Sequence, residues 1–145
     1  MSQESDELKT PLYARHVAEG AELGEEGGWV IPLYYVGALE EAAEVRRRAG
    51  VFDLTHLGRI RIRGDGALDL LERACTSDVA HQEDDTAAYT LLCNERGGVL
   101  ADALLLRLPD CWLMTTAAIC RRKVLEHLRA LAEKLEESDA RGEAA

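Results

Sequence analysis

The second half of the chain has the clearest pattern of apolar and polar positions. Residues 59–63 alternate Arg-Ile-Arg-Ile-Arg, which predicts a half-buried strand with Ile60 and Ile62 facing the core. Apolar residues spaced by three and four positions predict a helix over 67–75 and another over 119–135.

Three apolar runs lie between these two helices. The runs 87–94 and 99–108 flank the tetrapeptide Glu-Arg-Gly-Gly, a short glycine-containing loop that predicts a β-hairpin. Pro109 and Asp110 make a second tight connection, which leads into a run over 111–117. The order strand, helix, three strands and helix predicts an α+β fold, with antiparallel strands and with helices packed on one face.

The N-terminal part is patterned less clearly. Thr10 and Pro11 are typical of a helix start, so we expect a helix from Leu12 to about Leu23, ended by the glycine cluster at 24–28.

Two further elements are expected before residue 50. Residues 29–35 are aromatic and β-branched and predict a strand, which Pro32 restricts to an edge or irregular position. Residues 38–49 are rich in Ala, Glu and Arg and predict a helix.

Length and composition exclude several classes of function. The 145 residues are the size of one domain, and the polar ends, residues 1–9 and 138–145, predict a flexible lead and tail around a domain at 10–137. Acidic residues outnumber basic ones 27 to 17, which argues against binding to nucleic acid or to an anionic membrane. The apolar runs are shorter than the ~20 residues of a membrane span. The four cysteines form no CxxC pair, and the acidic N-terminus is unlike a secretory signal, so we expect reduced thiols in a cytoplasmic protein.

Candidate chemistry is sparse. None of the four histidines is spaced three to five residues from another histidine or cysteine, so no metal site is predicted. Asp102 is unusual because it lies inside the apolar run 99–108, on the face shared with Leu100 and Leu104. Two interpretations stay open: a solvent-facing aspartate, or a charged group aimed into a ligand cleft that Tyr89 could line.

A series of short motifs resembles the start of one known family. The series keeps one nearly ungapped register over about residues 10–128. Its motifs are Thr10-Pro11-Leu12-Tyr13, His16, Gly28-Trp29, Pro32, Val45-Arg46, Ala49-Gly50, Phe52-Asp53, Thr55-His56-Leu57-Gly58, Thr76-Ser77-Asp78-Val79, Tyr89-Thr90-Leu91, Asn94-Glu95, Gly97-Gly98-Val99 and Asp102. Together they resemble the N-terminal portion of the glycine cleavage system T-protein family, the tetrahydrofolate-dependent aminomethyltransferases.

The resemblance implies a folate-binding fold and a one-carbon transfer with tetrahydrofolate as cofactor. The family accepts an aminomethyl group carried on the lipoyl arm of its partner H-protein, releases ammonia and forms methylene-tetrahydrofolate. The resemblance implies that Asp102 is the catalytic residue, which contacts the folate and helps make it a competent nucleophile. It also implies that Leu57, Tyr89 and Asp102 bind the cofactor.

The sequence departs from the family pattern at several of these positions. Ala101 replaces the first aspartate of a pair, Leu57 replaces a methionine that packs on the folate, and Ala117 replaces an asparagine that also contacts it. Ala42 stands where the family usually has histidine. The change to Leu57 conserves apolar volume, whereas Ala117 has no group to form the lost hydrogen bond.

The family is also much longer than this chain, so we expect a truncated or split N-terminal portion that is not active by itself. It would work with a complementary C-terminal chain or associate with itself. Two alternatives stay open: a non-catalytic folate-binding or regulatory module, and an interaction protein that has lost folate.

Overall fold

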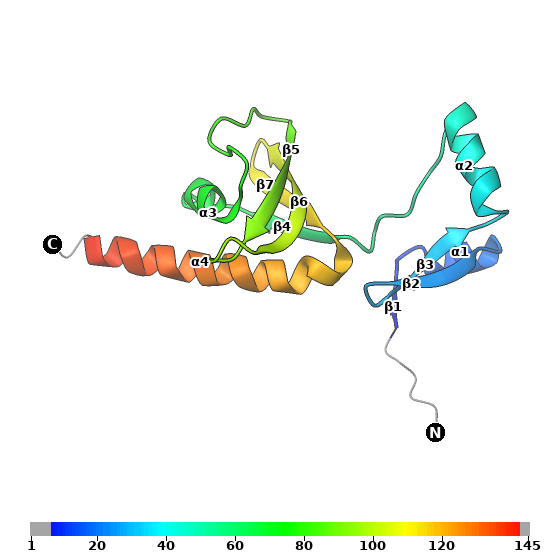
Figure 1. The fold of residues 1–145 in the computed structure, drawn as a ribbon, viewed down its shortest axis with the longest axis horizontal. Coiled ribbons are helices and arrows are strands. Elements are labelled where there is room, and N and C mark those ends of the chain that lie inside the picture. Colours follow the sequence, from blue (N-terminus) through cyan, green and yellow to red (C-terminus); the bar gives the residue numbers. More distant parts are fainter. Residues whose placement is uncertain (1–6, 143–145) are drawn as a thin grey trace, which may run out of the picture. The chain divides into compact units, whose positions relative to one another are not determined.

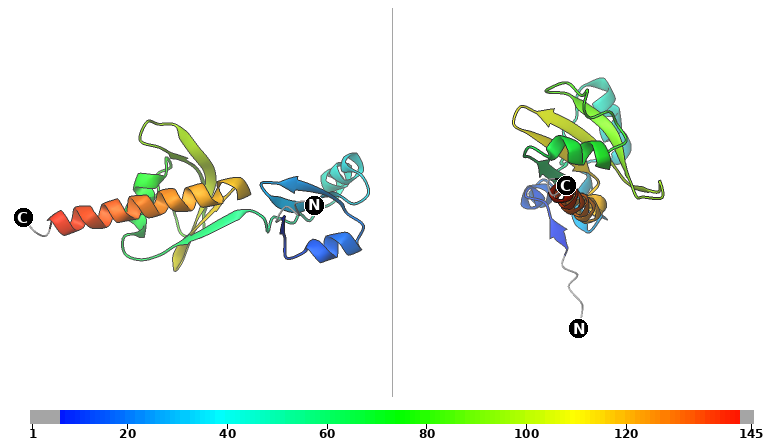
Figure 2. Two further views of the ribbon diagram at one scale, coloured as in Figure 1. Left: turned by 90° about the horizontal axis from the view of Figure 1, so that it is seen from below. Right: turned by 90° about the vertical axis from the view of Figure 1, so that its left-hand side faces the viewer.

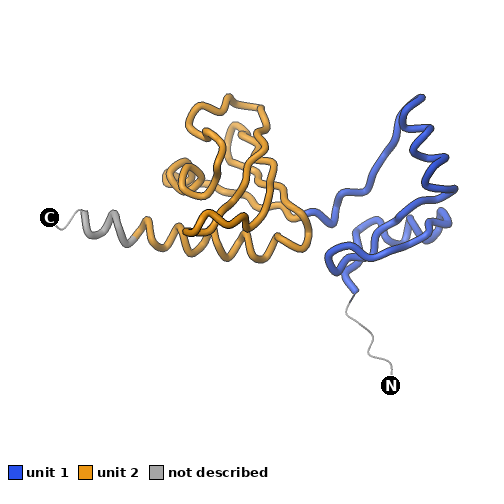
Figure 3. Tube along the Cα trace, viewed as in Figure 1, with its two compact units in different colours: residues 1–57 blue, residues 58–145 orange. Residues whose placement is uncertain are grey.

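The computed structural model describes the main chain of residues 7–142 and the side chains of residues 7–136 (Figure 1). The chain divides into two compact units, residues 1–57 and 58–145 (Figure 3). The boundary falls inside the range predicted as one domain. Residues 1–6 of the predicted lead and 143–145 of the predicted tail lie outside the described residues.

The C-terminal unit contains a four-stranded sheet and two main helices. Its elements are β4 (Gly58–Ile62), α3 (Ala67–Ala74), β5 (Ala87–Cys93), β6 (Val99–Leu108), β7 (Cys111–Thr116), the 3-10 turn η1 (Ala118–Cys120) and α4 (Arg121–Gly142). The strand order is β4-β7-β6-β5, and every neighbouring pair is antiparallel. The predicted α+β fold and its element order are therefore confirmed. The last helix is longer than predicted, because α4 continues through residues assigned to the tail.

One face of this sheet is packed and the other is open. Along β6, Ala101, Ala103 and Leu105 are buried, whereas Asp102 and Leu104 between them are exposed. The predicted inward pair on β4, Ile60 and Ile62, is buried as well. On the packed face these side chains form one core with apolar residues of α3 and α4, including Leu71, Val124 and Leu128. Figure 2 shows α4 running across the sheet.

The N-terminal unit is built around a smaller sheet. Its elements are β1 (Leu8–Lys9), α1 (Tyr13–Ala18), β2 (Glu22–Glu26), β3 (Trp29–Tyr34) and α2 (Ala38–Arg47). The strand order is β1-β3-β2, with β1 parallel and β2 antiparallel to β3. Leu8 and Lys9, which the sequence placed in the lead, thus form a short strand.

The helix predicted from Leu12 to about Leu23 is wrong in its second half. The helix α1 ends at Ala18, because Gly20 adopts a positive φ of 75° and the chain then turns back. The glycine cluster does not end a helix. Gly27 and Gly28, with φ of 58° and 86°, make the tight turn between β2 and β3, where such angles are required.

The strand predicted over 29–35 forms as β3, which is central in the strand order, although the edge or irregular position predicted from Pro32 holds for its second half. The partner β1 pairs only with Trp29 and Val30. Beyond Val30, β3 has β2 as its single neighbour, and Pro32 lies in that part, opposite Leu23. A proline is tolerated there because one side of the strand has no ladder to complete.

Candidate functional site

Two of the predicted site residues lie together on the open face of the four-stranded sheet. Tyr89 is on β5 and Asp102 on the adjacent β6, where they are diagonal neighbours in the register. The Tyr89 hydroxyl donates to Asp102 Oδ2 over 3.4 Å. The main-chain carbonyl of Asp102 accepts a 2.8 Å hydrogen bond from Thr116 Oγ1 on β7, which ties the position to a third strand.

Asp102 lies on the solvent-exposed face of β6 and is not enclosed among the apolar residues of its strand. The residue is exposed, and so is Tyr89, at 63% of its surface. The carboxylate therefore needs no buried partner, and it is available to a ligand that approaches this face.

The surface around this pair is largely apolar. Cross-strand pairing places Leu104 beside Tyr89, and Leu91 beside Asp102. The same face continues through Leu106 and its partner Leu113 on β7. Leu104 is 47% exposed, although it lies in the middle of a sheet. Tyr89 and Asp102 line none of the three hollows found in the described part of the structure, so the pair lies on open surface. An exposed apolar surface with one carboxylate can contact a partly apolar ligand that carries an N–H donor.

Leu57, the third predicted contact, belongs to the N-terminal unit. It is partly buried and lines a hollow of about 770 Å³ in that unit. The walls of this hollow are mostly apolar and come from β3, α2 and the segment at 48–57. The pair that the structure brings together within one unit is therefore Tyr89 and Asp102.

The structure also shows what the departure at Ala101 changes. Ala101 is buried on the helix-covered face, so its side chain lies on the opposite side of the sheet from Asp102. An aspartate at 101 would not share the open face with Asp102. The alanine therefore removes a carboxylate from the core side and leaves the open face around Asp102 unchanged.

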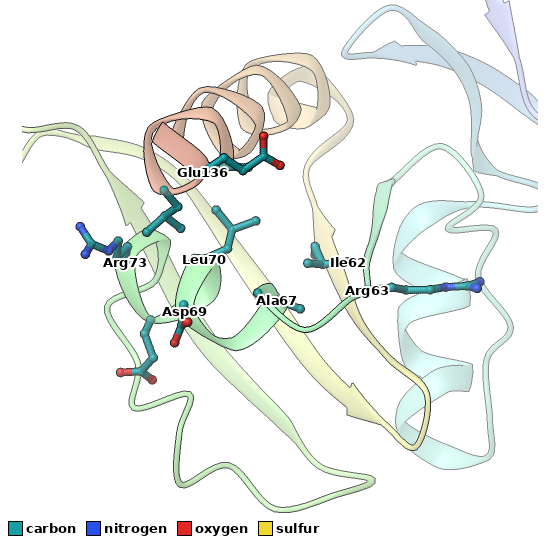
Figure 4. Close-up of a pocket in the computed structure, with 11 residues that line it drawn as sticks. Ile62, Arg63, Ala67, Asp69, Leu70, Arg73 and Glu136 are labelled. Atoms are coloured by element: carbon teal, nitrogen blue, oxygen red, sulfur yellow. The ribbon is translucent and has the colours of Figure 1, made fainter. Parts of the chain in front are cut away.

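A second hollow, of about 470 Å³, lies between α3 and α4 (Figure 4). Its apolar floor includes Ile62, Ala67 and Leu70, and charges of both signs, such as Arg73 and Glu136, surround it. Because Ile62 and Ala67 belong to the packed core, this hollow is on the helix side of the sheet. It is therefore separate from the Tyr89–Asp102 pair.

A hydrogen-bonded network in the N-terminal unit was not predicted from the sequence. His16 Nε2 donates to Asp53 Oδ2 over 2.8 Å, and the Tyr35 hydroxyl lies 2.7 Å from His16 Nδ1. Asp53 Oδ1 accepts from the Thr55 main-chain N–H and from its hydroxyl. Hydrogen-bonded partners in the network are up to 37 residues apart, so no local spacing pointed to them.

This network changes the electrostatics of Asp53. Its side chain is only 2% exposed. Burial acts to raise the pKa of this carboxyl, but hydrogen bonds from Thr55 and His16 outweigh burial and hold the pKa well below its usual range. Asp53 is therefore a buried, charged and fully bonded carboxylate at neutral pH.

The cysteines offer no nucleophile of obvious reactivity. All four are free thiols, and burial raises the pKa of Cys75 to about 11, so that thiol stays protonated near neutral pH. Among residues 7–142, no three His, Cys, Asp or Glu residues are grouped so that they could hold a metal ion. No helix in the described part of the chain has the length and apolar character needed to cross a membrane.

Comparison with known proteins agrees with the motif series. The family model described as the GCVT N-terminal domain matches residues 12–144. An aminomethyltransferase of Thermus thermophilus is 42% identical over 126 residues, which are 86% of this chain and 36% of that protein. The aminomethyltransferase of Rubrobacter xylanophilus is 39% identical over 121 residues, 83% of this chain and 32% of that protein.

A solved structure shows the same fold. The crystal structure of glycine cleavage system aminomethyltransferase T from Bartonella henselae superposes with a TM-score of 0.81 at 33% identity, covering 88% of this chain and 36% of that one. The chain thus spans about a third of the length of the relatives it matches. The motif series, the antiparallel sheet with its helices and these matches together show that the chain belongs to the GCVT N-terminal domain family of the glycine cleavage T-protein.

Proposed function

We propose that the chain binds tetrahydrofolate on the open face of the four-stranded sheet and contributes to a tetrahydrofolate-dependent aminomethyl-transfer site. The observation that carries this proposal is the Tyr89–Asp102 pair, exposed on an apolar face. The resemblance to the family implies that Asp102 corresponds to its catalytic aspartate. Family membership indicates folate as the class of ligand. The open face has apolar side chains and a carboxylate with which such a ligand could interact.

The proposed roles follow from the chemistry of each side chain. Bound tetrahydrofolate supplies the amine that takes up the one-carbon unit. The Asp102 carboxylate accepts a hydrogen bond from an N–H of the folate and so orients that amine. The Tyr89 hydroxyl holds one carboxylate oxygen, and its exposed ring provides apolar contact. Leu57, which the resemblance also implies as a folate contact, would provide a further apolar contact.

The partners are proposed on the same basis. A lipoyl-bearing H-protein would deliver the aminomethyl group, and the location would be cytoplasmic, as for a protein with four free thiols. A complementary chain, or a second copy of this one, would cover the apolar surface of the N-terminal unit.

A second candidate function is a non-catalytic folate-binding module. Ala117 favours it, because this residue directly follows β7 and has no side-chain group to replace the family's asparagine amide. Folate binding without aminomethyl transfer, in the presence of a lipoyl-bearing donor and a complementary chain, would identify this function.

Asp102→Asn tests the proposed site directly. The substitution keeps the shape of the side chain and removes its charge. We expect tetrahydrofolate binding to weaken by about 1.5–3 kcal/mol, the contribution of a hydrogen bond to a charged group. This corresponds to roughly a tenfold to hundredfold increase in Kd. Any aminomethyl transfer by the chain with its partners should be abolished. Calorimetric titration of both proteins measures the change in affinity.

Asp110→Asn is the matched control. Asp110 lies in the exposed turn between β6 and β7, so its replacement should leave folate affinity unchanged. Equal affinities of wild type and Asp102→Asn would show that the folate does not contact Asp102.

We expect the purified chain to associate at high concentration. Several large apolar side chains of the N-terminal unit are strongly exposed, and surfaces of this kind seek partners. They are Leu33, Val36, Leu39, Val51, Phe52 and Leu54. Sedimentation velocity over a concentration series should show a rising average mass, and Leu39→Lys with Val51→Lys should reduce it. A concentration-independent monomer would contradict this expectation.

A further inference from the structure

The segment at 48–57 follows α2 and has little regular structure of its own. It contains no helix or strand, and its turn is closed by a main-chain hydrogen bond from Leu57 N–H to Leu54 O. Val51 and Phe52 point their apolar side chains outward and are largely exposed. Main-chain pairing and apolar burial therefore do little to hold this segment, although it carries Leu57.

Two polar side chains of the segment are almost completely buried, those of Asp53 and His56. Of the two, Asp53 has both of its oxygens hydrogen-bonded, whereas His56 Nε2 lies 3.8 Å from Glu26 Oε2. One Asp53 oxygen accepts the two Thr55 donors and so shapes the turn that leads to Leu57. The other accepts from His16, which lies on α1, 37 residues earlier in the chain.

His16 connects three separate pieces of the N-terminal unit. It belongs to α1, its Nε2 contacts Asp53 in the segment, and its Nδ1 contacts Tyr35, the residue directly after β3. A neutral imidazole can make both hydrogen bonds: its Nε2–H donates to the Asp53 carboxylate, and its Nδ1 accepts from the Tyr35 hydroxyl. Its side chain is 7% exposed, so the ring is packed in one orientation.

We propose that His16 is a positioning residue: it locks the 48–57 segment through Asp53 and thereby sets the Leu57 side chain for contact with the ligand. This inference rests on the proposed folate function for the role of Leu57, whereas the locking of the segment does not. Each step is a direct contact between groups of one unit, from His16 to Asp53 and from Asp53 to the turn before Leu57.

Chymotryptic cleavage measures the order of the segment directly. Phe52 is the only phenylalanine of the chain, so a cut after it is identified by fragment mass. His16→Ala removes both contacts and should accelerate this cut by roughly tenfold or more, the effect of losing a hydrogen bond to a charged group. Tyr35→Phe removes one contact, keeps the His16–Asp53 pair and should accelerate it less. His16→Gln replaces the donor to Asp53 with an amide and should restore part of the protection.

His81→Ala is the matched control, because His81 makes a contact of 2.9 Å with Asp78 on an exposed surface. It should cleave at the wild-type rate. Wild-type cleavage rates in both His16→Ala and Tyr35→Phe would overturn the proposed lock. If His16→Ala does not fold, wild-type cleavage rates in both Tyr35→Phe and His16→Gln would overturn the proposed lock instead.

Tetrahydrofolate titration of the same variants tests the consequence for the ligand. We expect Kd to rise in the order wild type, His16→Gln, His16→Ala, in parallel with the cleavage rate. Faster cleavage with wild-type affinity would overturn the role in positioning Leu57 and leave the folate function standing. A wild-type chain that binds no tetrahydrofolate would overturn the proposed function and the role of Leu57. The cleavage rates by themselves would then show whether His16 holds the 48–57 segment.

Discussion

Leu105→Ala is expected to lower the free energy of unfolding of the C-terminal unit by about 3–5 kcal/mol. Leu105 lies in the middle of β6, is completely buried and packs in the core shared with α3 and α4. Truncation removes apolar burial and leaves a cavity that helices packed on a rigid sheet can fill only in part. Hydrogen–deuterium exchange at peptide resolution should show lost protection in β5, β6 and β7.

The adjacent Leu104 provides the control. It has the same side chain on the same strand, but it is on the open face and 47% exposed. Leu104→Ala should cost less than about 1 kcal/mol, since a half-exposed leucine loses little burial. Similar losses for the two variants would contradict the assignment of a packed and an open face, and with it the exposed location of Asp102.

His16→Ala is expected to destabilise the N-terminal unit by about 1.5–3 kcal/mol, the usual cost of losing a hydrogen bond to a charged group. The remaining carboxylate of Asp53, 2% exposed, would have no histidine donor. Hydrogen exchange should increase in α1, β3 and residues 48–57. Protection of the C-terminal unit should not change.

The exposed pair formed by His81 and Asp78 supplies the control for this variant too. His81→Ala should leave exchange in both units at the wild-type level, because water already surrounds that pair. Equal hydrogen exchange in His16→Ala and His81→Ala would show that the N-terminal unit is not stabilised by the contact between His16 and the buried Asp53.

The same carboxylate predicts how the N-terminal unit responds to acid. Asp53 has a lowered pKa in the folded chain, so the unfolded chain takes up its proton first, near the ordinary value of about 3.9. The contribution of ionised Asp53 to the stability of the N-terminal unit is therefore complete above about pH 5, and it is lost progressively as the pH falls below about 4. Exchange rates corrected for intrinsic pH effects should rise in the N-terminal unit over that range in wild type, and less in Asp53→Asn.

The sequence predicted the C-terminal unit well because its signals are local and agree with one another. The alternating segment 59–63 is confirmed as a strand. The runs 87–94 and 99–108, which the glycine-containing loop connects, are confirmed as neighbouring strands of the same antiparallel sheet. In these segments the period, the turn residues and the burial all favour the same structure. The family was likewise recognisable from an ordered series of short motifs.

The N-terminal unit was predicted less well because its signals conflict. Residues 19–23 continue a helix-compatible composition, and the decisive feature is the positive φ of Gly20, which turns the chain into a second strand. Pro32 predicted an edge or irregular strand, and the sequence does not reveal that β1 pairs with the first two residues of β3 and so makes it central there. Propensity was overridden here by pairing between distant segments.

The sequence by itself determined the fold class, the family and the identity of Asp102 and Tyr89 as candidates, because period and motif order are properties of the chain. Only the tertiary structure decided that Asp102 is exposed beside Tyr89, that Ala101 faces the opposite side, and that His16 holds Asp53. The register between strands, and contacts between residues as far apart as the 37 positions from His16 to Asp53, depend on how all elements of a unit pack together. A local sequence pattern does not contain this information.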